Sequence, residues 1–198
     1  MAKPPEHPAV YQLKATIRHV RPPVWRRLEV PGDVTLSDLH RILQAAFGWS
    51  DSHLHQFVVG GRFYGEPDPE NDWGPTVVDE RRVRLGALAA QGVKKLVYEY
   101  DFGDGWEHDV VVEKATPPAA GVAYPRCLAG RRACPLEDSG GPWGYENLLT
   151  ILGDPKHPEH AEFREWAGEE LDPEAFDIDM INAALRPRPR RRSSRVRS

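Results

Sequence analysis

The chain has 198 residues and a mass of 22.3 kDa, with 40% hydrophobic and 28% charged residues. This predicts one domain with a substantial core and excludes a small disulfide-stapled protein. No apolar run approaches the roughly 18 residues that cross a bilayer, and the first residues lack an apolar signal segment, so we expect a cytoplasmic protein without a membrane partner. Its two cysteines, Cys127 and Cys134, are too few for a disulfide framework.

Charge is distributed unevenly along the chain. Residues 1–134 hold 17 acidic and 17 basic side chains, residues 135–185 hold 13 acidic against two basic, and residues 186–198 hold seven arginines and no acid. Arginine, proline and serine cannot build a core, so we expect a flexible stretch over 1–9, one domain over 10–185 and a disordered tail over 186–198. Clustered tail arginines, including Arg190, Arg191 and Arg192, predict non-specific nucleic-acid binding through counterion release.

The sequence of the first half of the domain predicts two strands, a helix and a further strand, in that order. Alternating residues from Tyr11 to Val20 and the run Trp25 to Val30 are typical of strands. Thr35, with Asp38 three residues later, predicts a helix cap before an apolar stripe that ends at Gly48. Two short strands are then expected, over 54–59 and 62–64, followed by an acidic loop over 65–79.

The second half begins with a short helix around 83–90 and the clearest hairpin in the chain, Lys95 to Phe102 and Trp106 to Glu113 around Gly103-Asp104-Gly105. Helices are predicted at 145–152 and 159–167, and from Asp172-Pro173 towards Leu185. The expected fold class is therefore α+β: an N-terminal strand-strand-helix-strand mixed sheet with a long hairpin, followed by acidic C-terminal helices.

Several segments together resemble the plasmid pRiA4b ORF-3-like family, whose members are often labelled passenger or TnpR-like proteins of insertion sequences. They include RPPVWRRLEVPGDVTLSDLHRILQAAFGW, DSHLHQF, YEYDFGDGWEHDVVVE and YPRCLAGRRACPLEDSGGPWGYENLL, and the resemblance covers about residues 10–185. It implies an α+β fold and a link to plasmids and mobile elements. A resolvase reaction is not expected, because the chain lacks the serine motif of a serine recombinase near its N-terminus.

The hairpin residues are interpreted through strand parity. A three-residue loop would set Phe102 opposite Trp106 and place Trp106 and His108 on an aromatic face, which favours a hydrogen-bonded core role for His108 over catalysis. Asp101 and Asp104 are expected to cap the turn. The alternative is that the acidic face of the hairpin binds cations or a basic partner.

His53 and His55 follow the end of the first helix. Neutral imidazoles at this spacing can bind one metal ion or exchange protons near neutral pH. The alternative is a turn at Asp51-Ser52, with His55 packed beside Phe57. Zinc is the candidate cofactor, held by Cys127 and Cys134 with His53, His55 or His108; otherwise the cysteines are a pair of thiols.

The loop that carries the cysteines also contains Arg126, Arg131 and Arg132, near glycines that precede a helix at Tyr145. This pattern predicts an anion site, although the loop lacks the ending of a phosphate-binding loop. The helix-start residues His157 and His160 are interpreted as caps.

Two functions follow from these residues. The first is a non-catalytic binding or accessory module of a mobile element, with a protein or small-molecule ligand in a groove framed by the His53 loop, the hairpin turn and the 127–141 loop. Its groove candidates are His53, His55, Asp101, Asp104, Trp106, Arg131, Glu137, Asp138 and Tyr145. The alternative is a metal-dependent hydrolase or nuclease of the zinc type.

Overall fold

A single sheet of eight strands dominates the fold. The computed structural model describes residues 9–68, 75–168 and 171–186, and its strand order is β5-β4-β3-β6-β7-β1-β2-β8. Among the strand pairs of these residues, β4–β5 is parallel and the others are antiparallel. The strands are β1 (Val10–Ile17), β2 (Trp25–Pro31), β3 (His55–Val59), β4 (Arg62–Gly65), β5 (Val77–Asp79), β6 (Lys95–Tyr100), β7 (Trp106–Thr116) and β8 (Arg126–Arg131).

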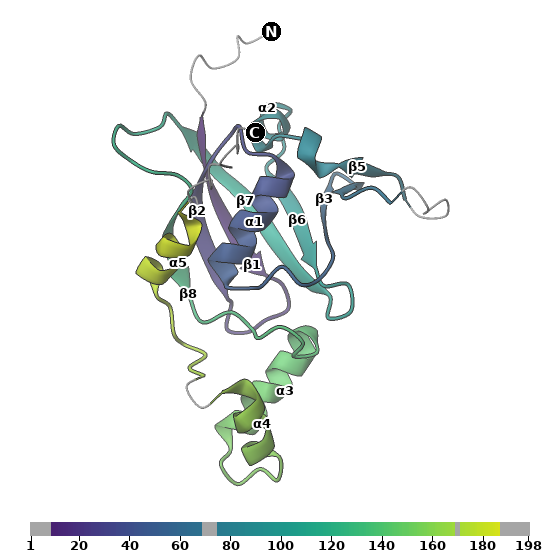
Figure 1. The fold of residues 1–198 in the computed structure, drawn as a ribbon, viewed down its shortest axis with the longest axis vertical. Coiled ribbons are helices and arrows are strands. Elements are labelled where there is room, and N and C mark those ends of the chain that lie inside the picture. The colour runs from purple at the N-terminus through teal and green to yellow at the C-terminus, as the bar shows by residue number, and fades with distance from the viewer. Residues whose placement is uncertain (1–8, 69–74, 169–170, 187–198) are drawn as a thin grey trace, which may run out of the picture.

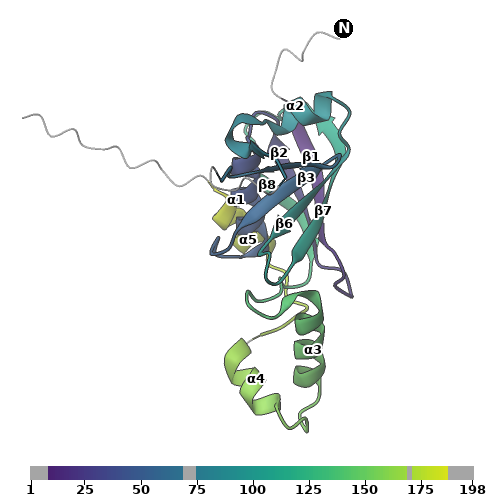
Figure 2. The same cartoon turned by 90° about the vertical axis from the view of Figure 1, so that its right-hand side faces the viewer.

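In the described part of the chain, five α-helices and one short 3-10 helix accompany the sheet. They are α1 (Leu36–Phe47), η1 (Glu80–Arg82), α2 (Leu85–Ala90), α3 (Gly141–Gly153), α4 (His160–Ala167) and α5 (Ile178–Leu185). Helices α1 and α5 lie against one face of the sheet, and α3 and α4 extend from one end of it (Figure 1, Figure 2). The expected mixture of helices with a sheet is confirmed, and the sheet is the larger part.

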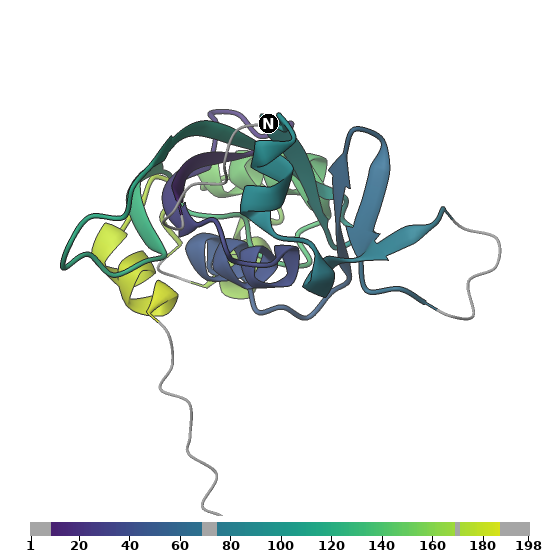
Figure 3. The ribbon, with the colours of Figure 1, turned by 90° about the horizontal axis from the view of Figure 1, so that it is seen from above.

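Helix α1 forms where its sequence predicts it. Thr35 accepts a hydrogen bond from the Asp38 amide, and the Asp38 carboxylate accepts one from the Thr35 amide, so the capping box is complete. Gly48 ends the helix in a left-handed conformation (φ 83°), which glycine adopts without a steric cost. Figure 3 shows α1 beside the curved sheet. The apolar residues of α1 are buried in the core.

The hairpin register differs from the one expected. Tyr100, not Phe102, lies opposite Trp106, and Phe102 is 54% exposed. The strand ends early because Asp101 takes a left-handed conformation (φ 55°) and its Oδ1 accepts hydrogen bonds from the amides of Gly103 and Asp104. The turn is therefore five residues long, and the expected capping role of Asp101 is confirmed.

The outer face of the hairpin is neutralised within the sheet. Asp109 forms ion pairs with Arg18 and Lys95, and Glu113 forms one with Arg27. Arg27 holds the pKa of Glu113 well below its usual value, at about 2. The acidic strip expected on this face is thus largely paired with basic side chains of neighbouring strands.

The last helix begins later than predicted. Asp172-Pro173 was expected at its start, but α5 begins at Ile178, where the Asp177 side chain accepts hydrogen bonds from two helix amides. Asp172 instead closes a local turn with the Glu174 amide. Within the described ranges no helix has the length and apolar character needed to span a membrane. The expectations for residues 1–8 and 187–198, including Arg190, Arg191 and Arg192, lie outside the described residues.

Candidate functional site

An open cavity of about 910 Å³ lies between α1, the loop that follows it, β3 and η1. Its polar lining includes His40, Asp51, His53, His55 and Glu80. The exposed apolar side chains of Leu54 and Phe102 also line it, at 72% and 54% exposure. A concave site that combines apolar surface with a few convergent polar groups is the usual setting for ligand binding.

Two stacked imidazoles form the floor of this cavity. The rings of His40, from α1, and His55, from the first residue of β3, are 3.5 Å apart between centroids with an interplanar angle of 4°. His40 is only 3% exposed. Burial, and then the neighbouring His55, lower the pKa of His40 below its ordinary value. Two positive charges this close would repel strongly, so the stack favours at least one neutral ring.

Each floor imidazole contacts a carboxylate. His40 Nε2 lies 2.7 Å from Asp51 Oδ1, and His55 Nε2 lies 2.9 Å from Glu80 Oε2. Glu80 is 4% exposed. Its burial acts to raise its pKa, but hydrogen bonding to His55 and Ser37 outweighs that effect, so the pKa of Glu80 is lowered. The floor therefore carries two histidine–carboxylate pairs from four different chain segments.

A second layer of side chains orients these pairs. The Tyr98 hydroxyl lies 2.8 Å from His40 Nδ1 and accepts a hydrogen bond from Gln44 Nε2 at 2.9 Å. The same Gln44 accepts from the Asp51 amide through its Oε1. Burial raises the pKa of Tyr98 well above its ordinary value, so its hydroxyl stays protonated. The two ring nitrogens of His40 thus have fixed and different partners.

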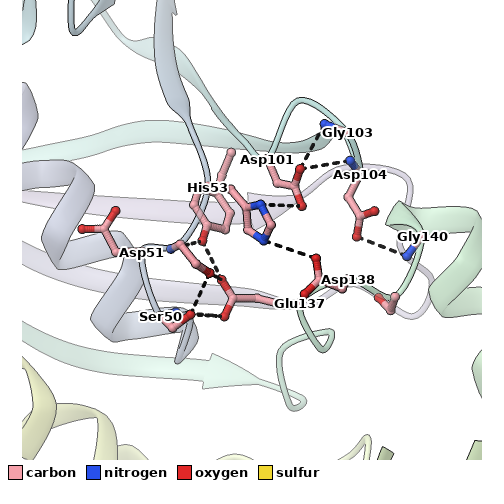
Figure 4. Close-up of polar contacts among 12 residues, drawn as sticks. Ser50, Asp51, His53, Asp101, Gly103, Asp104, Glu137, Asp138 and Gly140 are labelled. Atoms are coloured by element: carbon pink, nitrogen blue, oxygen red, sulfur yellow. Dashed lines mark hydrogen bonds and ion pairs between the residues drawn. The ribbon is translucent and has the colours of Figure 1, made fainter. Parts of the chain in front are cut away.

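Three loops, called the rim below, meet beside the cavity, as Figure 4 shows: Ser50–Leu54, Asp101–Gly105 and Pro135–Gly140. The first two contribute lining residues, among them His53 and Phe102, and the third does not. Glu137 joins the first and third, because it accepts hydrogen bonds from the Ser50 amide, the Ser50 and Ser52 hydroxyls and the Tyr100 hydroxyl. Burial, and then Glu137, raise the pKa of Tyr100 to about 12. The loops that the sequence predicted as the frame of a groove do lie together.

His53 sits between the carboxylates of the other two loops. Its Nδ1 lies 3.7 Å from Asp101 Oδ2, and its Nε2 lies 3.3 Å from Asp138 Oδ1. Asp51, Asp101 and Asp138 all adopt left-handed backbone conformations, with φ of 60°, 55° and 60°. Aspartate tolerates this region better than most residues, and such conformations gather at ligand sites.

The third loop docks closely on the hairpin turn. Asp104 Oδ2 accepts a hydrogen bond from the Gly140 amide at 3.1 Å. A Cβ atom on Gly141 (φ 70°) would lie 2.1 Å from the Asp104 carbonyl oxygen, so this approach requires glycine. Gly140 and Gly141, at the start of α3, therefore allow the third loop to pack closely against the hairpin turn.

The other predicted groove residues lie apart from the rim. Trp106 and Tyr145 are buried at 1% exposure, and Arg131 is exposed at the end of β8. The expected anion site is not assembled either, because Arg126 pairs with Glu29 and the buried Arg132 pairs with Glu174. Gly140, at the expected anion-binding amides, already donates its N–H to Asp104.

The proposed zinc ligands are also separated. Cys127 and Cys134 are free thiols near Arg26, away from the histidines, and burial raises the pKa of both. His108 is fully buried in the core, where its Nδ1 contacts the Tyr98 carbonyl oxygen and burial lowers its pKa to about 3. His55 does pack beside Phe57, with ring centroids 6.2 Å apart.

Sequence reasoning missed two residues of the cavity floor, His40 and Glu80. His40 falls inside the apolar stripe of α1, between Leu39 and Ile42, where a single histidine is usually a core residue. Glu80 lies in a charged stretch that is typical of a solvated loop. Only the tertiary structure brings them beside His55 and Asp51.

A family model described as plasmid pRiA4b ORF-3-like protein matches residues 9–180. The chain belongs to this family. It is 45% identical over 179 residues to the uncharacterized protein y4hQ of Sinorhizobium fredii (strain NBRC 101917 / NGR234), covering 89% of this chain and 91% of that protein. The crystal structure of MM3350, a protein of unknown function from Methanosarcina mazei Go1, matches with a TM-score of 0.80 and 39% identity, covering 87% of this chain and 97% of that one. These relatives establish the family and the fold, and their names state no activity.

Proposed function

We propose that the protein is a non-catalytic binding module, an accessory of a mobile element, that holds a basic side chain of a partner protein in the cavity beside α1. The observation that carries this proposal is the pairing of exposed apolar groups with carboxylates in one concavity. Leu54 and Phe102 line it together with the carboxylates of Asp51, Glu66, Asp68 and Glu80.

The charge of the lining favours a cation. Its two arginines already have acidic partners: Arg41 lies 3.7 Å from Asp38, and Arg81 lies 2.9 Å from Asp79. The four lining carboxylates outnumber the two arginines, although Glu66 also lies 3.8 Å from Arg81. Lysine and arginine combine an apolar stem with a charged head, so they suit a surface where apolar and acidic groups alternate. The Phe102 ring adds a face for a cation.

The test uses a short peptide with two arginines in a Gly/Ser background, and its binding is followed by fluorescence anisotropy in the presence of a chelator. We expect salt-sensitive binding, and no binding of a matched peptide in which glutamate replaces arginine. Phe102→Ser should weaken binding roughly 5-fold, equal to about 1 kcal/mol. Met180→Ser is the matched control, since Met180 is a 67% exposed side chain on α5.

The outcome is decided by the variants. If the Phe102→Ser and Met180→Ser proteins bind the arginine peptide with equal affinity, the peptide does not bind in the cavity. Absence of binding by the unmodified protein would refute the proposed function.

A further inference from the structure

The floor of the cavity gathers metal-ligating atoms from three segments of the chain. One ring nitrogen of His40, one of His55 and a carboxylate oxygen of Asp51 all lie within 4.8 Å of one another. In protein zinc sites, ligand bonds of about 2.0–2.2 Å bring the donor atoms of neighbouring ligands to within a few ångströms of one another. The three donors are thus already close to the separation that a single ion requires.

Hydrogen bonds prepare both imidazoles to act as neutral ligands. The Tyr98 hydroxyl accepts from Gln44 and can donate to His40 Nδ1, while His40 Nε2 donates its proton to the Asp51 carboxylate. An ion that binds Nε2 would displace this proton, and the Tyr98 hydroxyl could then accept from a proton on Nδ1. On His55, a proton on Nε2 is accepted by Glu80, so the lone pair lies on Nδ1. A carboxylate or hydroxyl partner on the second nitrogen is the usual outer layer of a metal-bound histidine.

The charge of the floor also favours a cation. In the ion pairs of the described residues, the partner of Asp51 and the partner of Glu80 is in each case a histidine, whereas nearby Asp79 and Asp38 pair with arginines. With neutral imidazoles, the two carboxylates leave a negative charge that is buried at Glu80, which is 4% exposed, and half exposed at Asp51, whose side chain is 52% exposed. A divalent ion would balance that charge.

From these contacts we propose that His40, Asp51 and His55 bind a divalent transition-metal ion of the zinc type, with Glu80 as a positioning residue on His55. Two imidazoles and one carboxylate suit such ions better than Ca²⁺ or Mg²⁺, which prefer oxygen ligands alone. The side facing the cavity stays open for water or a ligand atom. The lone pair of an imidazole lies in the plane of its ring, so the lone pairs of two parallel rings do not point at one ion. We therefore expect the rings of His40 and His55 to tilt apart when the ion binds.

The cysteines and His108 have no place in this site. It shares only His55 with the ligand set expected from the sequence, and it adds His40, which lies on the buried face of α1. The metal-dependent hydrolase or nuclease expected as the alternative function would need an ion of this kind, with water at its open position.

The experiment is a titration of the chelator-treated full-length chain with Zn²⁺ by isothermal calorimetry, repeated with Co²⁺ by visible absorption. We expect one ion per chain, without the charge-transfer band of a cobalt–thiolate bond. His40→Gln, Asp51→Asn and His55→Gln should each reduce affinity at least about 100-fold, and Glu80→Gln about 10-fold. His157→Gln is the matched control, because His157 lies in the turn before α4, away from the cavity lining.

Several results would overturn the inference. The first is that the unmodified chain binds no Zn²⁺ or Co²⁺. The second is that folded His40→Gln and His55→Gln proteins bind the ion with unchanged affinity. The third is that Cys127→Ser lowers the affinity for the ion. Loss with His53→Gln alone would assign the ion to His53, Asp101 and Asp138 instead. Circular dichroism and thermal unfolding of each variant distinguish removal of a ligand from failure to fold. Because the peptide assay is run with a chelator present, peptide binding and metal binding can fail independently.

Discussion

Buried polar groups beside two parts of the sheet, the β2–β8 edge and the β3–β6 pair, have opposite electrostatic surroundings. At the β2–β8 edge, Arg26 is 3% exposed and its guanidinium donates hydrogen bonds to the carbonyl oxygens of Trp25, Ala46, Arg131 and Arg132. Beside the β3–β6 pair, His40 and His55 face the carboxylates of Asp51 and Glu80 next to an open cavity.

Arg26 is a permanent cation that stabilises the fold, whereas His40 and His55 can change their charge by binding or releasing a proton. Burial lowers the pKa of Arg26, but arginine stays charged at any physiological pH, and its four acceptors belong to α1, β2 and the end of β8. It therefore ties these elements together permanently. Imidazoles that contact carboxylates near water can instead release a proton to water when a metal ion binds, or exchange one with a ligand, so the cavity is where function is expected.

The strongest test of this comparison removes the Arg26 guanidinium. Arg26→Met keeps most of the side-chain volume but leaves four carbonyl oxygens without their donor, so the free energy of unfolding should fall by about 3–5 kcal/mol. Arg27→Met is the matched control: Arg27 is partly exposed and pairs with Glu113, and its removal should cost about 1 kcal/mol or less. Denaturant unfolding of both variants measures the difference, and equal reductions would contradict the structural role of Arg26.

The second test concerns His108, a buried histidine that has no carboxylate partner. Its pKa in the folded protein is lowered to about 3 from its ordinary value of 6.5. The unfolded chain therefore binds a proton as pH falls below 6.5 while the folded protein does not. The stabilising effect is complete above pH 6.5 and is lost progressively between pH 6.5 and about 3, by about 1.4 kcal/mol per pH unit.

His108→Leu isolates this contribution from that of the acidic residues. The variant should lose about 1 kcal/mol at pH 7, where the hydrogen bond to the Tyr98 carbonyl is missing. Between pH 6.5 and 5 its stability relative to the unmodified protein should rise by roughly 2 kcal/mol. A stability difference that does not change with pH would show that the pKa of His108 is the same in the folded protein as in the unfolded chain.

The sequence predicted the parts of the fold that depend on local patterns. The order of β1, β2, α1, β3 and β4 follows from alternation and from the Thr35–Asp38 capping box, and the resemblance identified the family correctly. Strands β5 and β8 were missed because they are edge strands that long connections bring to the sheet. Local periodicity carries no record of such pairings.

The site was predicted in part for the same reason. Loop residues such as His53, Asp101 and Asp138 were chosen correctly as neighbours, because turn-rich segments at strand ends are recognisable. His40 was missed because its position in α1 matches that of a core residue, and Phe102 was misplaced because Asp101 ends the strand through its own side chain. In both cases a tertiary or side-chain contact determined the outcome: the Asp101 side chain set where strand β6 ends, and the contacts with Asp51 and His55 set the role of His40.

A third test separates the rim from the floor. Glu137 accepts hydrogen bonds from the Ser50 amide and from the hydroxyls of Ser50, Ser52 and Tyr100. Glu137→Gln replaces one of its acceptor oxygens by a donor, so the free energy of unfolding should fall by about 1–2 kcal/mol. It should leave metal affinity unchanged, since Glu137 does not line the cavity floor. Glu146→Gln, an exposed position on α3, is the control and should have no measurable effect. A drop in metal affinity with Glu137→Gln would show that rim and floor form one unit.

The smallest effect on stability is expected from the arginine-rich end of the chain. Truncation after Leu185 should leave the thermal midpoint nearly unchanged and abolish duplex DNA binding at low salt, because the seven arginines of residues 186–198 supply the cations that displace counterions. Replacement of Arg190, Arg191 and Arg192 by alanine should lower the slope of log affinity against log salt by about 0.9 for each phosphate that the chain no longer neutralises.

If the tail instead pairs with the acidic residues between Glu137 and Asp179, truncation would lower stability in a salt-sensitive way and the intact chain would bind DNA weakly. DNA binding that survives truncation with the same slope would contradict both outcomes and point to exposed residues of the body such as Arg131, since Arg132 is buried and paired with Glu174.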